Sequence, residues 1–236
     1  MVEQLERRSL FTRAQQDYLK ALYLLGGDGR PVPTRDLAQR LGISSPSVSE
    51  MVTRLSAQGL VEHDRYRGQQ LTPNGRKVAL ELVRHHRLLE VFLVRVLGYG
   101  WDEVHDEAER LEHVISERME KRIFELLGRP ELDPHGHAIP TLAGKLPPVS
   151  HRALSECRAG EKVTVQRVSD DDPVKLRELE RRGLMPGTRI AVVAGSEFEG
   201  PIDVRFKGRR ESVPLGLARA IFVAGAPPAA RRADSS

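Results

Sequence analysis

Two short helical patterns joined by one glycine constrain the fold of this chain more than any other feature. Residues 34–41 carry apolar side chains at helical spacing, and Gly42 ends them. Residues 45–55 repeat the pattern behind a serine cap, with Pro46 in the first helical turn. A helix, a glycine turn and a second helix together are typical of a helix-turn-helix.

A predicted hairpin follows this pair and completes a winged helix. Residues 59–61 and 70–72 have strand character, and 66–69 form the tip. Small hydroxyl residues let the second helix approach DNA closely, and basic residues of the wing meet the phosphates. We expect DNA contacts from Thr34, Arg35, Ser44, Ser45, Pro46, Ser47, Ser49, Arg54, Arg65 and Arg67. The alternative use of such a fold is protein contact.

Composition excludes several classes of protein. The 236 residues are 39% hydrophobic and 30% charged, which suits a folded protein of several small domains. Apolar runs are too short to span a membrane, and residues 1–13 lack a signal-peptide core, so we expect a cytoplasmic location. The single Cys157 excludes an intramolecular disulfide and a thiolate-rich zinc site. A net charge of +4 permits nucleic-acid binding without requiring it.

Two further helical patterns predict two helices in the middle of the chain. Pro73 opens a long helix that ends at Gly98, and a second helix runs from Trp101 to Leu127. The second helix carries more apolar surface than one small domain needs to bury. It therefore predicts a homodimer with two-fold symmetry, and such dimers bind pseudo-palindromic double-stranded DNA.

The second of these helices also predicts a metal site. Four metal-binding side chains fall on one face at helical spacing: His105, Glu109, Glu112 and His113. A solvated face would more often mix in lysine and arginine. His86 and Glu90 stand four residues apart on the preceding helix, and antiparallel pairing of the two helices would bring them opposite His105.

The last third of the chain changes to strand periodicity. Residues 130–148 predict a linker, in which His135 and His137 pack or turn instead of binding metal. From residue 154, short strands and one helix at 173–182 predict an SH3-like β-barrel. The fold class is mainly α with a small β domain. Its predicted parts are a winged helix-turn-helix (1–75), a helical metal-binding and dimerisation domain (76–148), an SH3-like domain (149–225) and a disordered tail (226–236).

Several stretches together resemble one family, the diphtheria toxin repressor and manganese transport regulator family of metal-dependent transcription factors. They are Ser45-Pro46-Ser47-Val48-Ser49, Tyr66-Arg67-Gly68, Leu71-Thr72, residues 86–90, residues 105–113, Pro134-His135-Gly136 and Leu184-Met185-Pro186-Gly187. The resemblance covers nearly the whole chain, with the last domain similar to the FeoA type. It implies two metal positions per subunit. The first would use Asp17, Glu109, Glu112 and His113, and the second would use His86, Glu90, His105 and Asp172.

The same resemblance bears on which metal is bound. Iron-responsive members carry Met and Cys where this chain has Asp17 and Glu109. Hard carboxylate oxygens suit Mn²⁺, so Mn²⁺ is expected first and Fe²⁺ next. The manganese-responsive branch has a glutamate where this chain has Lys20, which disfavours a two-manganese cluster. Lys175 stands where the family often has a glutamine.

The function that the resemblance implies is that of a metal-dependent DNA-binding regulator that represses metal-uptake genes. A metal ion would fix the first helix against the dimerisation domain and so set the spacing of the two reading helices. The alternative is a winged-helix regulator that responds to a small molecule. An enzyme is not expected, because no HExxH, G-x-S-x-G or phosphate-loop motif is present. A peptide-binding scaffold would need more aromatic residues than residues 149–225 contain.

Overall fold

The computed structural model describes residues 11–27, 29–64, 66–147, 149–195 and 199–225. These fall into two compact units. The first comprises residues up to Leu89, with Glu107–Glu131 and Ile139–Leu146; the second comprises Glu90–Asp106, Leu132–Ala138 and the chain from Pro147 onward. Arg65 and the predicted tail lie outside the described residues. Within the described part of the chain, no helix is long and apolar enough to cross a membrane.

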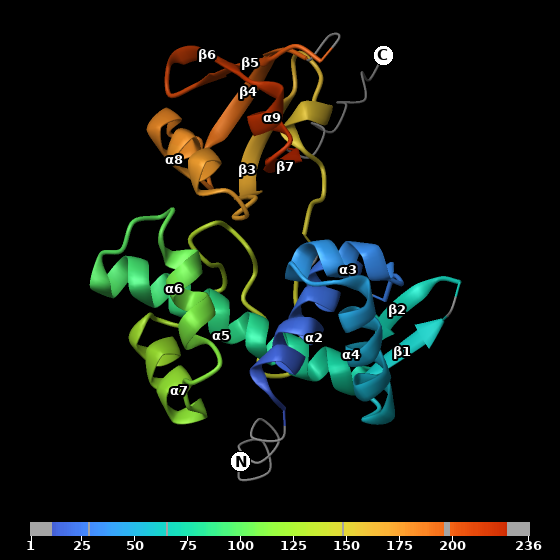
Figure 1. Ribbon diagram of the computed structural model, residues 1–236. Coiled ribbons are helices and arrows are strands. Elements are labelled where there is room, and N and C mark those ends of the chain that lie inside the picture. The colour runs from blue at the N-terminus through green and yellow to red at the C-terminus, as the bar shows by residue number, and fades with distance from the viewer. Residues whose placement is uncertain (1–10, 28, 65, 148, 196–198, 226–236) are drawn as a thin grey trace, which may run out of the picture. The chain divides into compact units, whose positions relative to one another are not determined.

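The first unit contains the winged helix. Its helices are α2 (Arg13–Gly26), α3 (Thr34–Leu41) and α4 (Ser45–Ala57), followed by β1 (Val61–Asp64) and β2 (Gly68–Leu71). Figure 1 shows α3 and α4 beside α2, with the β1–β2 hairpin extending from them. Leu19, Leu22, Leu37 and Leu55 are among the buried side chains of its core.

The turn between α3 and α4 has the predicted chemistry. Gly42 adopts a φ of 64°, a left-handed conformation that glycine tolerates best. Ser44 caps α4 by accepting a hydrogen bond from the backbone N–H of Ser47. β1 and β2 pair antiparallel, with Val61 opposite Leu71, so the predicted wing is present.

Helix α5 (Pro73–Leu97) follows the wing directly. A Cβ on Gly75 would lie 2.0 Å from the carbonyl oxygen of Leu60. Because only glycine permits this approach, Gly75 fixes how the start of α5 packs on the base of the wing.

The single helix predicted for Trp101–Leu127 is wrong. The structure has α6 (Val104–Leu111) and α7 (Glu117–Leu126), separated by a turn. Ser116 caps α7 by accepting a hydrogen bond from the N–H of Met119, and Glu117 and Glu120 lie in the first turn. A serine followed by acidic residues is a strong helix start, and here it outweighs the continuous apolar period.

The second unit is built around an antiparallel sheet. Its elements are a short 3₁₀ helix η1 (Leu154–Glu156), β3 (Lys162–Val168), α8 (Pro173–Arg182), β4 (Arg189–Ala194), β5 (Ile202–Phe206), β6 (Arg209–Val213), α9 (Leu215–Ala218) and β7 (Ile221–Gly225). The strand order is β6-β5-β4-β3-β7. The five strands form an open sheet with β6 and β7 at its edges, whereas we predicted a barrel. Leu176 and Leu179 of α8 pack into the same core as the sheet. Figure 1 shows α8 beside the strands.

Candidate metal centre

A group of six polar side chains gathers inside the first unit, and we call it the first cluster. Its members are Asp17 and Lys20 of α2, His86 of α5, Glu109 of α6, and Glu112 and His113 directly after α6. Lys20 and His86 are only 6% and 5% exposed, and Glu112 is fully buried. Charged groups at this depth require partners, because the protein interior solvates them poorly.

One half of the first cluster joins α2 to the end of α6. His113 Nε2 lies 2.9 Å from Asp17 Oδ1 and 3.7 Å from Glu112 Oε1. Gln16 Oε1 lies 2.7 Å from His113 Nδ1. Because an amide oxygen only accepts, Nδ1 is the protonated nitrogen. The ring therefore presents its unprotonated nitrogen, Nε2, to the two carboxylates, and this nitrogen would bind a cation.

The other half of the first cluster surrounds Lys20. Its ammonium Nζ lies 2.6 Å from Glu109 Oε2, 2.7 and 2.8 Å from the two oxygens of Glu112, and 3.1 Å from His86 Nδ1. Sequence reasoning missed this contact. The spacing of Lys20, one turn after Asp17, was the available signal, because i and i+3 share a helix face.

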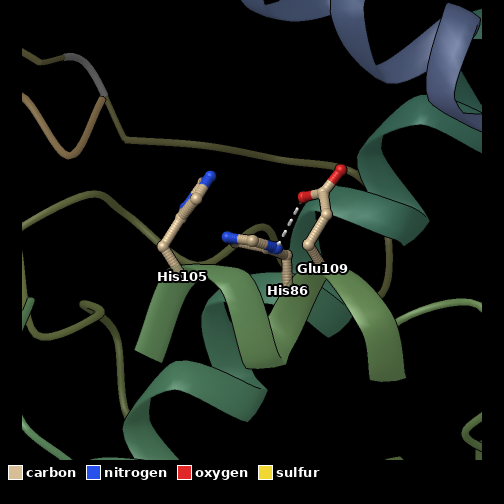
Figure 2. Close-up of side chains that lie close together, drawn as sticks. All are labelled: His86, His105 and Glu109. Atoms are coloured by element: carbon tan, nitrogen blue, oxygen red, sulfur yellow. Dashed lines mark ion pairs between the residues drawn. The ribbon is translucent and has the colours of Figure 1, made fainter. Parts of the chain in front are cut away.

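His86 also has partners that its spacing did not suggest. We predicted it with Glu90 and His105; its ring also lies against Lys20 and Glu112, and its Nδ1 is 3.5 Å from Glu109 Oε2. Figure 2 shows His86 pointing toward Glu109, with His105 projecting from the preceding turn of α6. The ring of His86 is thus part of the Lys20 half of the first cluster.

A second group of acidic and histidine side chains lies in the second unit, and we call it the second cluster. Its members are Glu90, His105, Asp133, His135 and Asp170. Glu90 is fully buried and lies 3.5 Å from His105 Nδ1 and 3.8 Å from His135 Nδ1 through its two oxygens. Asp170 joins Glu90 and His105 in one group of possible ligands, and Asp133 and His135 join Glu90 in another.

The environment of the second cluster shifts two pKa values. Burial opposes protonation of His135, but the facing carboxylate of Glu90 and the charge of Asp133 raise its pKa to about 9. Burial also opposes ionisation of Asp170, yet facing histidines, His137 first, lower the pKa of its carboxyl. At neutral pH the second cluster therefore holds a cationic imidazole among carboxylates, and a metal ion bound through His135 would displace its proton.

The structure bears on two sequence expectations for the second cluster. Asp172 caps α8 by accepting hydrogen bonds from the N–H groups of Val174 and Lys175, so Asp170 is the aspartate of that run beside Glu90. Three consecutive aspartates gave the sequence no means to choose between them. His135, expected to pack or turn, is packed: it is fully buried beside Glu90, and its Nε2 donates to the Trp101 carbonyl oxygen.

The predicted DNA-contact residues that the structure describes lie on α3, on α4 and its N-cap, and on the wing. Ser44, Ser45, Pro46, Ser47 and Ser49 are all exposed, as are Arg35, Arg54 and Arg67. Thr34 is half-buried, and its hydroxyl is 3.4 Å from Gln69 Oε1. Arg54 pairs with Glu50 one turn earlier on α4. An exposed helix N-terminus rich in hydroxyls, next to a wing bearing Arg67, suits contact with DNA phosphates.

A divalent cation fits the donors of both clusters. Carboxylate oxygens and imidazole nitrogens are ligands of first-row divalent metals, and a predominance of oxygen favours the harder ones. His113 Nε2 is buried and lacks a hydrogen-bond partner, as expected of an atom reserved for a cation. A winged helix joined to such a cluster defines a metal-responsive DNA-binding protein.

Comparisons with known proteins agree with this class. Residues 10–69 match the iron-dependent repressor N-terminal DNA-binding domain, 72–141 match the iron-dependent repressor metal-binding and dimerisation domain, and 152–225 match the FeoA domain. The iron-dependent repressor IdeR of Mycobacterium leprae is 37% identical over 188 residues, which cover 74% of this chain and 81% of the relative. The diphtheria toxin repressor of Corynebacterium efficiens is 32% identical over 218 residues, covering 87% and 93%.

Solved structures give the same result. A manganese-dependent transcriptional repressor in complex with manganese shares 44% identity and a TM-score of 0.84, covering 90% of this chain and all of that one. The manganese regulator SloR shares 32% identity and a TM-score of 0.74, covering 90% and 98%. The chain belongs to the iron-dependent repressor family of metal-dependent, DNA-binding transcriptional repressors. This membership favours metal over a small organic molecule as the effector.

Proposed function

We propose that this chain is a homodimeric repressor that binds operator DNA when a divalent cation, Mn²⁺ before Fe²⁺, occupies the first cluster. The observation that supports this most is the 2.9 Å approach of His113 Nε2 to Asp17 Oδ1, because Asp17 belongs to α2 of the winged helix. A bound cation supplies a bond between α2 and the segment after α6. Asp17, Glu112 and His113 would hold it, with Glu109 as the predicted fourth ligand.

The residues of the first cluster explain why a cation would act as a switch. Asp17 and Glu112 both approach His113, so the two carboxylates repel each other unless positive charge lies between them. Gln16 holds the His113 ring in the orientation that presents Nε2. Binding favours the arrangement in which α2 and the end of α6 are close, and that arrangement sets the position of α4.

Manganese is proposed first because of the chemistry of the donors. Asp17 and Glu109 present oxygen where sulfur would favour iron or later metals. In the second cluster we propose Glu90, His105 and His135 as ligands, with Asp170 in place of Asp172. We also propose three functional domains with the predicted boundaries, and action in the cytoplasm, where the operator DNA would be.

The test measures DNA affinity with and without Mn²⁺. Fluorescence anisotropy with a labelled fragment from the promoter of the chain's own gene would compare the wild type with Asp17→Ala. We expect Mn²⁺ to raise the affinity of the wild type at least tenfold and to leave that of Asp17→Ala unchanged. Glu125→Ala, at an exposed position of α7, is the control and should respond like the wild type. A full Mn²⁺ response from Asp17→Ala would refute the proposal.

A further inference from the structure

A third group of carboxylates and a histidine lies between α5 and α7 and shares no residue with the first or second cluster. Glu81 and His85 stand one turn apart on α5, and Glu117 begins α7. One donor atom from each of these three residues lies within 4.8 Å of the other two. Glu120, one turn after Glu117, also faces the histidine. We call these four residues the third cluster.

His85 faces α7, whereas its neighbour His86 belongs to the first cluster. Successive residues of a helix point about 100° apart, so two adjacent histidines can serve different sides of α5. Nε2 of His85 lies 3.5 Å from Glu120 Oε2 and 3.9 Å from Glu117 Oε1. The ring of His85 is thus directed at the first turn of α7.

The ring of His85 lies in surroundings that hydrogen bonds do not explain. It is fully buried, and neither ring nitrogen makes a hydrogen bond within the part of the chain that the structure describes. Buried polar atoms are nearly always paired. The separations of 3.5 and 3.9 Å are too long for hydrogen bonds. They are close to the roughly 3.4 Å between two ligands of one ion when each lies about 2.1 Å from it in a tetrahedral arrangement.

We propose that the third cluster binds a first-row divalent cation through Glu81, His85 and Glu117, with Glu120 as a further ligand. An imidazole nitrogen and several carboxylate oxygens are donors that such ions take. The ion would join the middle of α5 to the start of α7 and so brace the domain that is expected to form the dimer. The proposed metal-sensing function uses other residues, so this site does not depend on it.

The charges of the third cluster favour a cation. Arg84 pairs with Oε1 of Glu120, while Oε2 of the same carboxylate faces His85. Glu117 and Glu120 both lie in the first turn of α7, where the positive end of the helix dipole keeps carboxylates ionised. With Glu81 they bring three carboxylates from two helices together. A divalent cation among them would offset their mutual repulsion.

Crystals of the full-length protein grown with Zn²⁺ test the proposal, because nitrogen and oxygen donors bind Zn²⁺ more tightly than Mn²⁺. Anomalous scattering at the zinc absorption edge locates each ion. We expect a peak within about 2.2 Å of a ring nitrogen of His85 and of carboxylate oxygens of Glu81 and Glu117. Zinc in the first or second cluster with none beside His85, or no zinc at all, would overturn the proposal.

Equilibrium dialysis against Zn²⁺ examines the same site in solution. Glu81→Gln removes a charged ligand at a half-buried position and keeps the side-chain shape, so it should bind one ion fewer per chain when free Zn²⁺ just saturates the wild type. Glu125→Gln, at an exposed position of α7, is the control and should bind as many ions as the wild type. Equal numbers for all three proteins would contradict the proposal. Glu117→Gln gives the same comparison from α7 if Glu81→Gln does not fold.

Failure of this site and failure of the proposed function have different signatures. If Mn²⁺ raises DNA affinity but no ion lies beside His85, metal sensing through the first cluster stands and only the third cluster is wrong. If an ion lies beside His85 but DNA affinity does not respond to Mn²⁺, the third cluster is a metal site and the proposed function is wrong.

Discussion

At the residue scale, the buried ion pair between Arg84 and Glu120 links α5 to α7. The two side chains are 5% and 3% exposed. Arg84 also donates to the Pro140 carbonyl oxygen at 2.7 Å and lies over the Phe124 ring at 4.5 Å from its centre. Burial alone would raise the pKa of Glu120, but His85 and Arg84 lower it. This carboxylate is thus stabilised as an anion that has no access to water.

We predict that Glu120→Gln lowers the free energy of unfolding at pH 7 by about 3–5 kcal/mol, because it leaves Arg84 buried without its counter-charge. The pKa of Glu120 is lower in the folded state, so its contribution is present above the unfolded pKa of about 4.3. It is lost as the pH falls through the lower native value. The difference between the two proteins should therefore shrink under acid conditions. Urea unfolding measures it, with Glu125→Gln as the control; equal stability of all three at pH 7 would contradict the prediction.

The choice of metal is also argued at the residue scale. Asp17→Met combined with Glu109→Cys replaces two hard oxygens by sulfur, so we predict that the response shifts from Mn²⁺ toward Fe²⁺. DNA affinity would be titrated with each metal under anaerobic conditions, and the ratio of the two midpoints compared with the wild type. An unchanged ratio would show that these two donors do not select the metal.

At the scale of elements, the loop at 132–138 connects the second cluster to the sheet. The backbone N–H of Val168 on β3 donates to the His135 carbonyl oxygen at 2.9 Å. Gly136 has a φ of 89°, and a Cβ there would lie 2.1 Å from the Gln166 carbonyl oxygen. The loop can follow β3 this closely only because position 136 has no side chain.

We predict that Gly136→Ala pushes this loop away from β3 and lowers stability by about 1–3 kcal/mol, since both the contact and the positive φ are lost. Metal bound at the second cluster should weaken as well, because Asp133 and His135 lie on the same loop. Thermal unfolding and equilibrium dialysis measure the two effects. Gly160→Ala shares the positive φ but meets nothing within 4 Å, and it serves as the control for backbone strain alone.

The wing allows a prediction on DNA binding. Arg67 is exposed, and its backbone N–H donates to Asp64 at the hairpin turn. If it contacts a phosphate, Arg67→Ala should weaken binding to all sequences and reduce the slope of log affinity against log salt by about 0.9. Affinities over a range of salt concentrations give this slope. If Arg67→Ala weakened binding to the operator sequence but not to other DNA, Arg67 would contact bases instead of phosphates.

How far the sequence predicted these elements depended on local signals. Gly42 and Ser44 predicted the turn between α3 and α4, because helix capping and a positive φ depend on neighbouring residues in the sequence. The break before α7 was missed because an apolar period continued across it. The contact of Lys20 with Glu109 and Glu112 was also missed, since side chains so far apart in sequence meet only through tertiary packing. Likewise, nothing in the spacing of Asp170 and Asp172 showed which one would turn inward.

At the scale of the whole molecule, the exposed apolar residues around α7 are our candidate for the dimer interface. Val114, Met119 and Leu126 are 74%, 46% and 68% exposed in the single chain, inside the part that matches the metal-binding and dimerisation domain. Exposed apolar side chains gathered in this way mark an interface. We predict that Leu126→Glu shifts the protein from dimer to monomer and weakens operator binding, which analytical ultracentrifugation and anisotropy would detect. A stable dimer of this variant would place the interface elsewhere.

The place of Lys20 has a consequence for how such regulators can diverge. A lysine codon becomes a glutamate codon when only its first base changes. In the first cluster that single base would replace the ammonium by a carboxylate beside Glu109 and the buried Glu112. One mutational step would thus turn an attraction between α2 and the end of α6 into a repulsion.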